Sequence, residues 1–278
     1  MATDRAALDL ADADAIRRFV RGQGPDLIVN AAAYTQVDTA ETEPDLAMRV
    51  NGIAPGIIAE EAKRSHCATV HYSTDYVFSG SIARPYLEDD EPDPINVYGA
   101  TKLAGEEAIR AVGTPHLIVR TSWVFDSRGK NFLNTILKLA REREELRVVD
   151  DQVGTPTWSR AVADATVQIL TRLARRSATI VDGIANTSGT YHLCCEDPTS
   201  WFGFAKEIVE KYRRGAGNDR PRTLRASSII PISSAEYPTL AKRPRYSVLS
   251  PRKVADAFGV VMPSWRDQLE LVLQELRT

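Results

Sequence analysis

The segment DLIVN at residues 26–30 is a short apolar run that leads directly into three alanines at positions 31–33. A run of this length, rich in apolar residues, predicts a strand that is buried on both faces. Similar runs follow at residues 68–73 and 117–121. Because strands buried on both faces are typical of parallel sheets, these segments predict one parallel sheet.

Helical stretches separate the predicted strands. A long candidate helix covers residues 42–65, and shorter ones cover residues 98–111 and 131–142. Strands and helices that alternate in this way predict an α/β fold, in which a doubly wound parallel sheet is covered by helices on both faces.

The alternating pattern loosens after about residue 150. The turn-rich segment DQVGTPTW at residues 151–158 precedes a candidate helix at residues 162–173 and a short strand at residues 191–195. In α/β proteins, ligands bind beyond the C-terminal ends of the strands. We therefore expect residues 151–278 to form a smaller lobe over that edge of the sheet, although the chain is free to cross between the lobes.

The composition excludes several classes of partner. Of 278 residues, 43% are hydrophobic and 26% are charged, and the formal net charge is −2. This balance does not favour nucleic acid or an anionic membrane surface. The cysteines, Cys67, Cys194 and Cys195, contain no CxxC pair, and we expect no metal site. The sequence has no apolar run of membrane-spanning length and no signal peptide, so we expect a cytoplasmic protein.

Tyr98 and Lys102 lie four residues apart in the segment VYGATKL at residues 97–103. On a helix they would share one face. A neighbouring ammonium group favours the phenolate, so we expect Lys102 to lower the pKa of Tyr98 and make it a general acid near neutral pH. The alternative is an ordinary solvated helix face, because both residue types are common.

Polar or small residues follow two of the predicted strands. A hydroxyl of Ser73 or Thr74 could hold a carbonyl oxygen together with Tyr98, or these residues could simply form a strand-terminal turn. After the first strand, the alanines at positions 31–33 would let a flat cofactor approach the backbone, or would pack tightly.

Several segments point together to one family. They are NAAAYTQVD at 30–38, HYSTDYVFSG at 71–80, NVYGATKLAGE at 96–106, RTSWVF at 120–125, NFLNTILKLAREREEL at 131–146, DQVGTPT at 151–157 and YPTLAKRPRYSVL at 237–249. In this order the chain resembles the extended short-chain dehydrogenase/reductases, and among them the dTDP-4-dehydrorhamnose reductases. The resemblance implies a Rossmann-like fold, with an NAD(P)-binding domain in residues 1–150 and a substrate-binding lobe in residues 151–278.

The resemblance also implies a reaction, hydride transfer from NADPH or NADH to C4 of dTDP-4-dehydro-L-rhamnose. Tyr98 would donate the proton, Lys102 would tune Tyr98 and bind the nicotinamide ribose, and Thr74 would hold the keto oxygen. The implied cofactor site comprises Asp9, Leu10, Asn30, Ala31, Ala32, Tyr34, Ser73, Tyr98 and Lys102. The implied substrate contacts come from Thr74, Asp75, Trp123, Asn131 and Arg243. For Asp75 and Trp123 the alternatives are a turn cap and a core aromatic residue.

The sequence departs from the family at its start. The family opens with a strand and a glycine-rich turn, G-x-x-G-x-x-G, which binds the cofactor diphosphate. Residues 1–5 of this chain align with the end of the family's second strand, and the early glycines Gly22 and Gly24 lack that spacing. We expect either that the natural protein starts further upstream, or that the chain is truly short, binds dinucleotides poorly and is inactive.

Other functions stay open from the sequence. The chain could reduce another nucleotide-deoxysugar. It could also resemble the regulatory subunit of methionine adenosyltransferase, a relative that uses the fold to bind a partner without catalysis. Retention of Thr74, Tyr98 and Lys102 favours an enzyme. Some family members form dimers bridged by a metal on glutamates, but Arg160 falls near one such position. We therefore expect no metal, and either a monomer or a homodimer.

Overall fold

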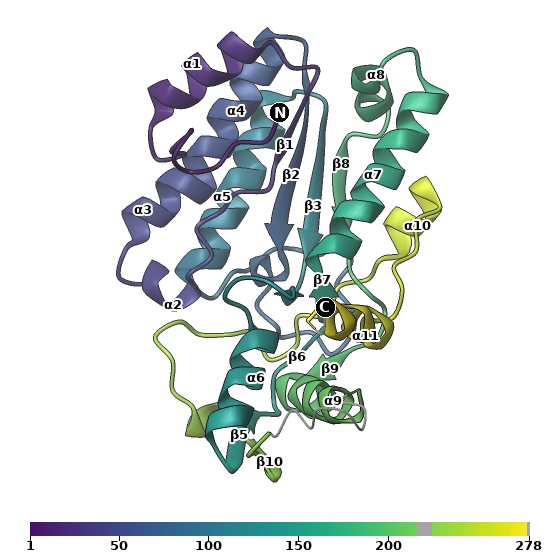
Figure 1. The fold of residues 1–278 in the computed structure, drawn as a ribbon. Coiled ribbons are helices and arrows are strands. Elements are labelled where there is room, and N and C mark those ends of the chain that lie inside the picture. The colour runs from purple at the N-terminus through teal and green to yellow at the C-terminus, as the bar shows by residue number, and fades with distance from the viewer. Residues whose placement is uncertain (216–223, 277–278) are drawn as a thin grey trace.

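The computed structural model describes residues 1–215 and 224–276. Its main sheet has the strand order β1-β2-β3-β8, and every pair of neighbouring strands is parallel (Figure 1). The strands are β1 (Leu27–Asn30), β2 (Ala68–Thr74), β3 (His116–Thr121) and β8 (Gly189–His192). The predicted parallel α/β sheet is confirmed.

The register of the central strands brings polar residues to one edge of the sheet. Val70 on β2 pairs with Leu117 on β3, and Thr74 pairs with Thr121. The apolar residues therefore fill the middle of the sheet, and the hydroxyl groups stand at its C-terminal edge. This is the edge at which open α/β sheets bind ligands.

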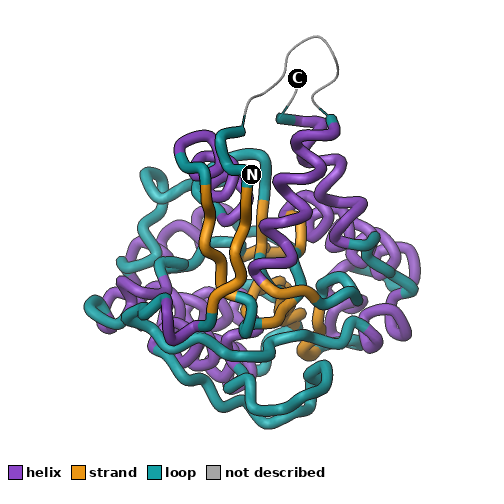
Figure 2. The backbone as a smooth tube through the Cα atoms, turned by 90° about the horizontal axis from the view of Figure 1, so that it is seen from below, coloured by secondary structure: helices purple, strands orange, loops and turns teal. Residues whose placement is uncertain are grey.

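Alternate residues of β2 face opposite layers of helices, as the two-residue period of a strand requires. Ser73 contacts Glu106 on α5 (Val97–Val112), whereas the hydroxyl of Tyr72 lies 2.8 Å from that of Thr166 on α7 (Ser159–Arg176). Figure 1 accordingly shows α1, α4 and α5 on one side of the sheet and α7 and α8 on the other, and Figure 2 shows the strands between the helices. The sheet is doubly wound.

The helices of these layers are α1 (Ala13–Gln23), α2 (Val37–Ala40), α3 (Pro44–Met48), α4 (Ala54–Arg64), α5, α7 and α8 (Ile180–Ala185). The long helix predicted over residues 42–65 is confirmed in its extent, because α3, the π-helical turn η1 (Arg49–Ile53) and α4 follow one another without a break, but the π-helical turn within it was not predicted. Pro55 has no N–H to continue the α-helical ladder, and the side chain of Asn51 bonds to Tyr34 instead of facing solvent.

A second layer lies beyond the C-terminal ends of β2 and β3, in the lower part of Figure 1. It contains α6 (Phe132–Glu142), β5 (Glu145–Val149), α9 (Trp201–Arg214) and β10 (Ser228–Ile232), and β5 pairs in parallel with β10. Short strand pairs join the layers, namely β4 (Val124–Phe125) with β7 (Thr157–Trp158) and β6 (Val153–Gly154) with β9 (Thr199–Ser200). The chain thus crosses between the layers more than once.

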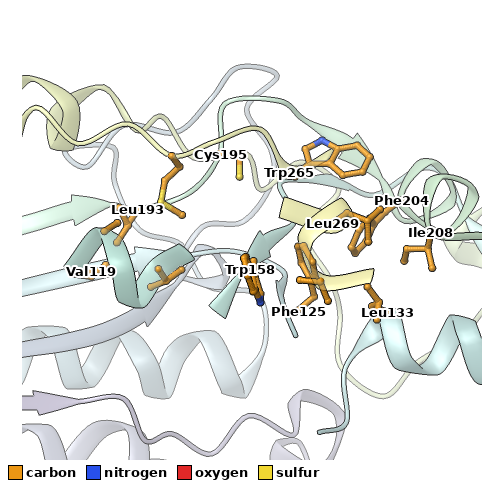
Figure 3. Packing of buried hydrophobic residues seen from close by; sticks show 14 of the residues in the cluster. Val119, Phe125, Leu133, Trp158, Leu193, Cys195, Phe204, Ile208, Trp265 and Leu269 are labelled. Atoms are coloured by element: carbon orange, nitrogen blue, oxygen red, sulfur yellow. The ribbon is translucent and has the colours of Figure 1, made fainter. Parts of the chain in front are cut away.

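The largest hydrophobic cluster connects the sheet to this second layer (Figure 3). Val119 of β3, Trp158 of β7 and Phe204 of α9 belong to it, together with Trp265 and Leu269 of α11 (Trp265–Glu275). Each fully buried side chain of this size contributes about 1.5–3 kcal/mol, so the cluster fixes the second layer against the sheet. α10 (Arg252–Phe258) packs nearby against β8. No helix in the described ranges is long and apolar enough to span a membrane.

Candidate active site

Thr74 and Tyr98 meet at the C-terminal edge of the sheet. Thr74 ends β2, and Tyr98 lies in the first turn of α5, which begins where the side chain of Asn96 accepts from Gly99 N at 2.7 Å. A Cβ atom on Gly99 would lie 2.1 Å from the carbonyl oxygen of Tyr76. Only glycine lets the start of α5 approach the turn after β2 this closely, and that approach places Tyr98 beside Thr74.

Thr74 lies beside Tyr98, close enough for its hydroxyl group to affect the pKa of the phenol. Burial raises the pKa of Tyr98 to about 12, although the neighbouring hydroxyl of Thr74 opposes the rise. The expected lowering of this pKa by Lys102 is therefore wrong for this structure, because the lysine amine is bound elsewhere. At neutral pH Tyr98 is a protonated phenol, the form that donates a proton to an oxygen acquiring negative charge.

Lys102 lies one turn after Tyr98 on α5 and is almost fully buried. Its Nζ donates to the carbonyl oxygen of Tyr72 at 2.6 Å and lies 3.3 Å from Nε2 of His71. Burial lowers the pKa of Lys102 to about 8, since a charged amine is poorly solvated there. The amine can therefore gain or lose a proton near physiological pH.

The hydroxyl groups of Ser73 and Thr74 have different neighbours in the structure. Ser73 donates to Glu106 Oε1 at 2.5 Å and so belongs to a buried ionic cluster, whereas Thr74 faces Tyr98. Glu106 also accepts from Arg120 at 2.7 and 2.9 Å and from Arg110 at 3.1 Å. The expected role of Ser73 in cofactor binding stays a prediction.

Asp75 follows Thr74 and is 2% exposed. Thr74 Oγ1 donates to Asp75 Oδ1 at 3.0 Å and also accepts from Tyr76 N at 3.1 Å, so Asp75 fixes the hydroxyl beside Tyr98. Burial raises the pKa of Asp75 from 3.8 to about 7, although the neighbouring hydroxyl groups of Ser247 and Thr74 favour the charged form and oppose the rise. The carboxyl group thus changes charge within the working range of an enzyme.

We expect the free energy of unfolding to depend on pH because of the Asp75 carboxyl group. A folded-state pKa above the unfolded value means that the folded protein binds more protons, so the contribution of Asp75 to the free energy of unfolding falls as pH rises from about 4 to about 7. Denaturant unfolding of the wild type and of Asp75→Asn across this range measures the difference. The asparagine variant should gain relative stability with rising pH, and a pH-independent difference would contradict the assignment.

Six of the expected cofactor residues border one cavity of about 790 Å³ that runs along β1, the edge strand of the described sheet. They are Asp9, Leu10, Asn30, Ala31, Ala32 and Tyr34. Asn51 holds this segment, because its side chain accepts from Tyr34 N at 2.8 Å and donates to Tyr34 O at 3.0 Å. No pattern in the sequence indicated this role for Asn51, which lies in the π-helical turn η1.

The expected substrate residues differ in their surroundings. Trp123 has a φ of 45° and stacks on Trp201 with ring centroids 3.4 Å apart, and Gly154 leaves the room that its ring needs. Asn131 caps α6 and donates to two backbone carbonyls, so its polar atoms already have partners in the structure. Arg243 forms two bonds with the carboxylate of Asp38, at 2.7 and 3.2 Å.

A second cavity, of about 1070 Å³, lies between α6, β5 and the segment 234–245. Basic side chains line part of it, namely Arg143, Arg147, Lys242, Arg243 and Arg245. Aromatic side chains line another part, among them Phe132, Trp201 and Tyr237. A cavity with positive charge beside aromatic surface can take an anionic ligand that carries a flat ring.

The family model described as "RmlD substrate binding domain" matches residues 1–278. The chain belongs to this family. Two relatives named dTDP-4-dehydrorhamnose reductase agree with it. The one from Burkholderia thailandensis is 45% identical over 99% of this chain and 90% of its own length, and the one from Escherichia coli K12 is 40% identical over 97% and 86%.

Solved structures of the same family have the same fold. The dTDP-4-dehydrorhamnose reductase of Bacillus anthracis, in complex with NADP, is 36% identical with a TM-score of 0.83 and is matched over 98% of this chain and 89% of its own. The one from Clostridium acetobutylicum is 33% identical with a TM-score of 0.87, over 100% and 90%. The Rossmann-like architecture expected from the sequence is confirmed.

Proposed function

We propose that this chain is an NADPH-dependent oxidoreductase that reduces the C4 keto group of dTDP-4-dehydro-L-rhamnose to give dTDP-L-rhamnose. The observation that carries the proposal is the placement of Tyr98 beside Thr74 at the C-terminal edge of the sheet, with Lys102 one turn further along α5. Family membership and relatives with this named activity support it. NADH is the alternative cofactor, and a cytoplasmic location and a monomer or homodimer stay predictions.

The residues around the cavity along β1 suit a dinucleotide. Asp9 and Asn30 offer polar atoms, and Ala31 and Ala32 leave the backbone accessible. The neighbour from Bacillus anthracis was solved with NADP, in accord with this assignment. When bound, the nicotinamide supplies a hydride to the carbonyl carbon of the substrate.

The residues of this chain handle the oxygen of that carbonyl group. Tyr98 donates its phenolic proton to the developing alkoxide. Without substrate, Thr74 donates its own proton to Asp75 Oδ1 at 3.0 Å, and it becomes a second donor to the alkoxide when that proton turns from Asp75 to the substrate oxygen. The buried amine of Lys102 supplies hydrogen-bond donors one helical turn from Tyr98, which suits the hydroxyl groups of a ribose.

The second cavity suits the nucleotide part of the substrate. One guanidinium group can bind two oxygens of a phosphate at once, and an aromatic ring can stack on a base. The arginines and aromatic residues that line this cavity therefore match a thymidine diphosphate group. Trp123 and Trp201 would lie near the sugar. We include Asp75 and Asn131 among the substrate-site residues as part of the proposal.

Arg243 offers a direct test of the diphosphate assignment. We expect Arg243→Ala to raise the KM for the dTDP-sugar ~10- to 100-fold, because a hydrogen bond to a charged group contributes about 1.5–3 kcal/mol. Asp38→Ala is the matched control, since it breaks the same ion pair and leaves the arginine in place. Equal increases in KM for the two variants would show that Arg243 only holds its loop, which would contradict contact with the diphosphate.

Oxidation of NADPH in the presence of dTDP-4-dehydro-L-rhamnose tests the proposed function itself. We expect turnover with this substrate, and less with a nucleotide-deoxysugar that carries a different base or keto position. Turnover that is faster with another deoxysugar would favour a different reductase. Binding of a protein partner without any turnover would favour the non-catalytic alternative.

A further inference from the structure

His71 links the amine of Lys102 to the end of β1. Nε2 of His71 lies 3.3 Å from Nζ of Lys102, and Nδ1 of the same ring lies 3.1 Å from Nδ2 of Asn30. His71 is 2% exposed, Lys102 is 1% exposed and Asn30 is 8% exposed. Hydrogen bonds that are shielded from water in this way hold their partners more firmly than exposed ones. The three side chains come from β2, α5 and β1, so the chain of bonds crosses the site.

The surroundings of Asn30 decide which ring nitrogen carries the proton. The side-chain oxygen of Asn30 accepts from Ala32 N at 3.2 Å, so its amino group faces the ring and donates to Nδ1. The proton of a neutral ring then lies on Nε2 and is directed at Lys102. Burial and the neighbouring Lys102 lower the pKa of His71 well below 6.5, so the ring stays neutral.

The amine of Lys102 completes the chain. It donates to the Tyr72 carbonyl oxygen at 2.6 Å, and its uncharged form can accept from Nε2 of His71. Burial lowers the pKa of Lys102 to about 8, so the uncharged form predominates only above that pH. In that form Lys102 is held from two sides, by the backbone of β2 and by His71. The contact with Tyr72 is made by its backbone and would survive a substitution there, whereas the contact with His71 is made by its side chain and can be removed by substitution.

We propose that His71 is a positioning residue for Lys102, which fixes the lysine amine in the active site and ties its place to Asn30 at the border of the cofactor cavity. His71 does not touch the substrate in this role. Its effect passes through Lys102, and Asn30 fixes the orientation of its ring. The kinetic part of the test rests on the proposed reductase activity, whereas the spectroscopic part does not.

Two substitutions distinguish the contact that His71 Nε2 makes with Lys102 from the contact that Nδ1 makes with Asn30. The amide of a glutamine can stand where Nε2 stands, and the amide of an asparagine where Nδ1 stands. His71→Gln therefore keeps a partner for Lys102, and His71→Asn keeps only the contact with Asn30. We expect His71→Asn to lower kcat ~10- to 100-fold, with His71→Gln within about threefold of wild type, because small displacements of a catalytic group are costly.

The pH profile adds a readout that packing alone would not move. The titratable groups around Lys102 are Tyr98 and Glu106 on its own helix and His71 on β2, while Asn30 of β1 is uncharged. The negative charge of Glu106 is balanced by its ion pair with Arg120 of β3. Loss of the Nε2 donor destabilises the uncharged amine and so raises the pKa of Lys102. The inflection of the pH–rate profile that reports Lys102 should therefore move to higher pH in His71→Asn and stay in place in His71→Gln.

The reverse ranking of the two variants would overturn the proposal, and so would equal losses that follow thermal stability with an unchanged pH profile. ¹⁵N NMR of histidine-labelled wild type tests the geometry without any assay of activity. We expect a neutral ring protonated at Nε2, whose signal moves in Lys102→Met. A ring protonated at Nδ1, or a signal that ignores Lys102→Met, would overturn the proposal even if the chain proves to be no reductase.

Discussion

Replacing Tyr98 with phenylalanine should lower kcat for reduction of the dTDP-keto sugar ~100- to 10,000-fold, the range of a positioned general acid. The substitution removes one oxygen atom and keeps the ring that packs edge-to-face against Tyr76, with centroids 5.8 Å apart. The fold and the KM for the substrate should therefore change little. Steady-state oxidation of NADPH, followed for both proteins across a range of pH, measures the effect.

Thr74→Val is the matched control for this prediction. It removes the hydroxyl that lies beside Tyr98 and keeps a side chain of similar shape, so the loss in kcat should be smaller than that of Tyr98→Phe. The two losses should not add in the double variant, because both groups act on the same oxygen atom. A Tyr98→Phe variant with nearly the rate of the wild type would show that the proton comes from another group.

The largest effect on stability should come from Glu106. Its carboxylate is 0% exposed and accepts from Arg120, which is 2% exposed, at 2.7 and 2.9 Å. Glu106→Ala would leave the buried guanidinium group without its counter-charge, and breaking a buried pair in this way costs about 3–5 kcal/mol. The free energy of unfolding from denaturant titration should fall by that amount.

Glu210→Ala is the control for this measurement. Glu210 lies on the exposed part of α9, 4.0 Å from Lys206, and such a surface pair contributes about 0–1 kcal/mol. Equal losses for the two variants would contradict the importance of the buried pair. Fluorescence and circular dichroism should report the same midpoint, since a cooperative unfolding transition licenses the comparison.

Acid should weaken the contribution of the Glu106 carboxylate to the free energy of unfolding. Burial would raise the pKa of Glu106, but the hydrogen bond and charge of Arg120 outweigh it and lower the pKa below 4.5. A lowered folded-state pKa means that the stabilisation is present above the unfolded value and is lost as pH falls through the folded value. The difference in stability between wild type and Glu106→Gln should therefore shrink as the solution is acidified.

Local patterns in the sequence predicted most of the sheet. The apolar runs around residues 26–30, 68–73 and 117–121 became β1, β2 and β3, because burial on both faces leaves a clear signal in the sequence. The pairing of β5 with β10 had no such signal. Its partners Glu145 and Ser228 are far apart in the sequence, and only the folded chain brings them together.

The site shows the same division between local and long-range effects. The spacing of Tyr98 and Lys102 correctly placed both on one helix, but the direction of the lysine amine depends on His71 and the backbone of Tyr72. Likewise, only the fold reveals that the hydroxyl of Ser73 donates to Glu106 while that of Thr74 donates to Asp75 and lies beside Tyr98. Side-chain direction at the end of a strand depends on neighbours that no local pattern contains.

The proposed hydride transfer to C4 can be tested in one measurement. The chain is incubated with dTDP-4-dehydro-L-rhamnose and NADPH that carries deuterium at the transferred position, and the sugar product is analysed by mass spectrometry and NMR. We predict dTDP-L-rhamnose with deuterium bound to C4. A product without deuterium at C4, or no reduced sugar while the unlabelled substrate is recovered, would contradict the proposed function.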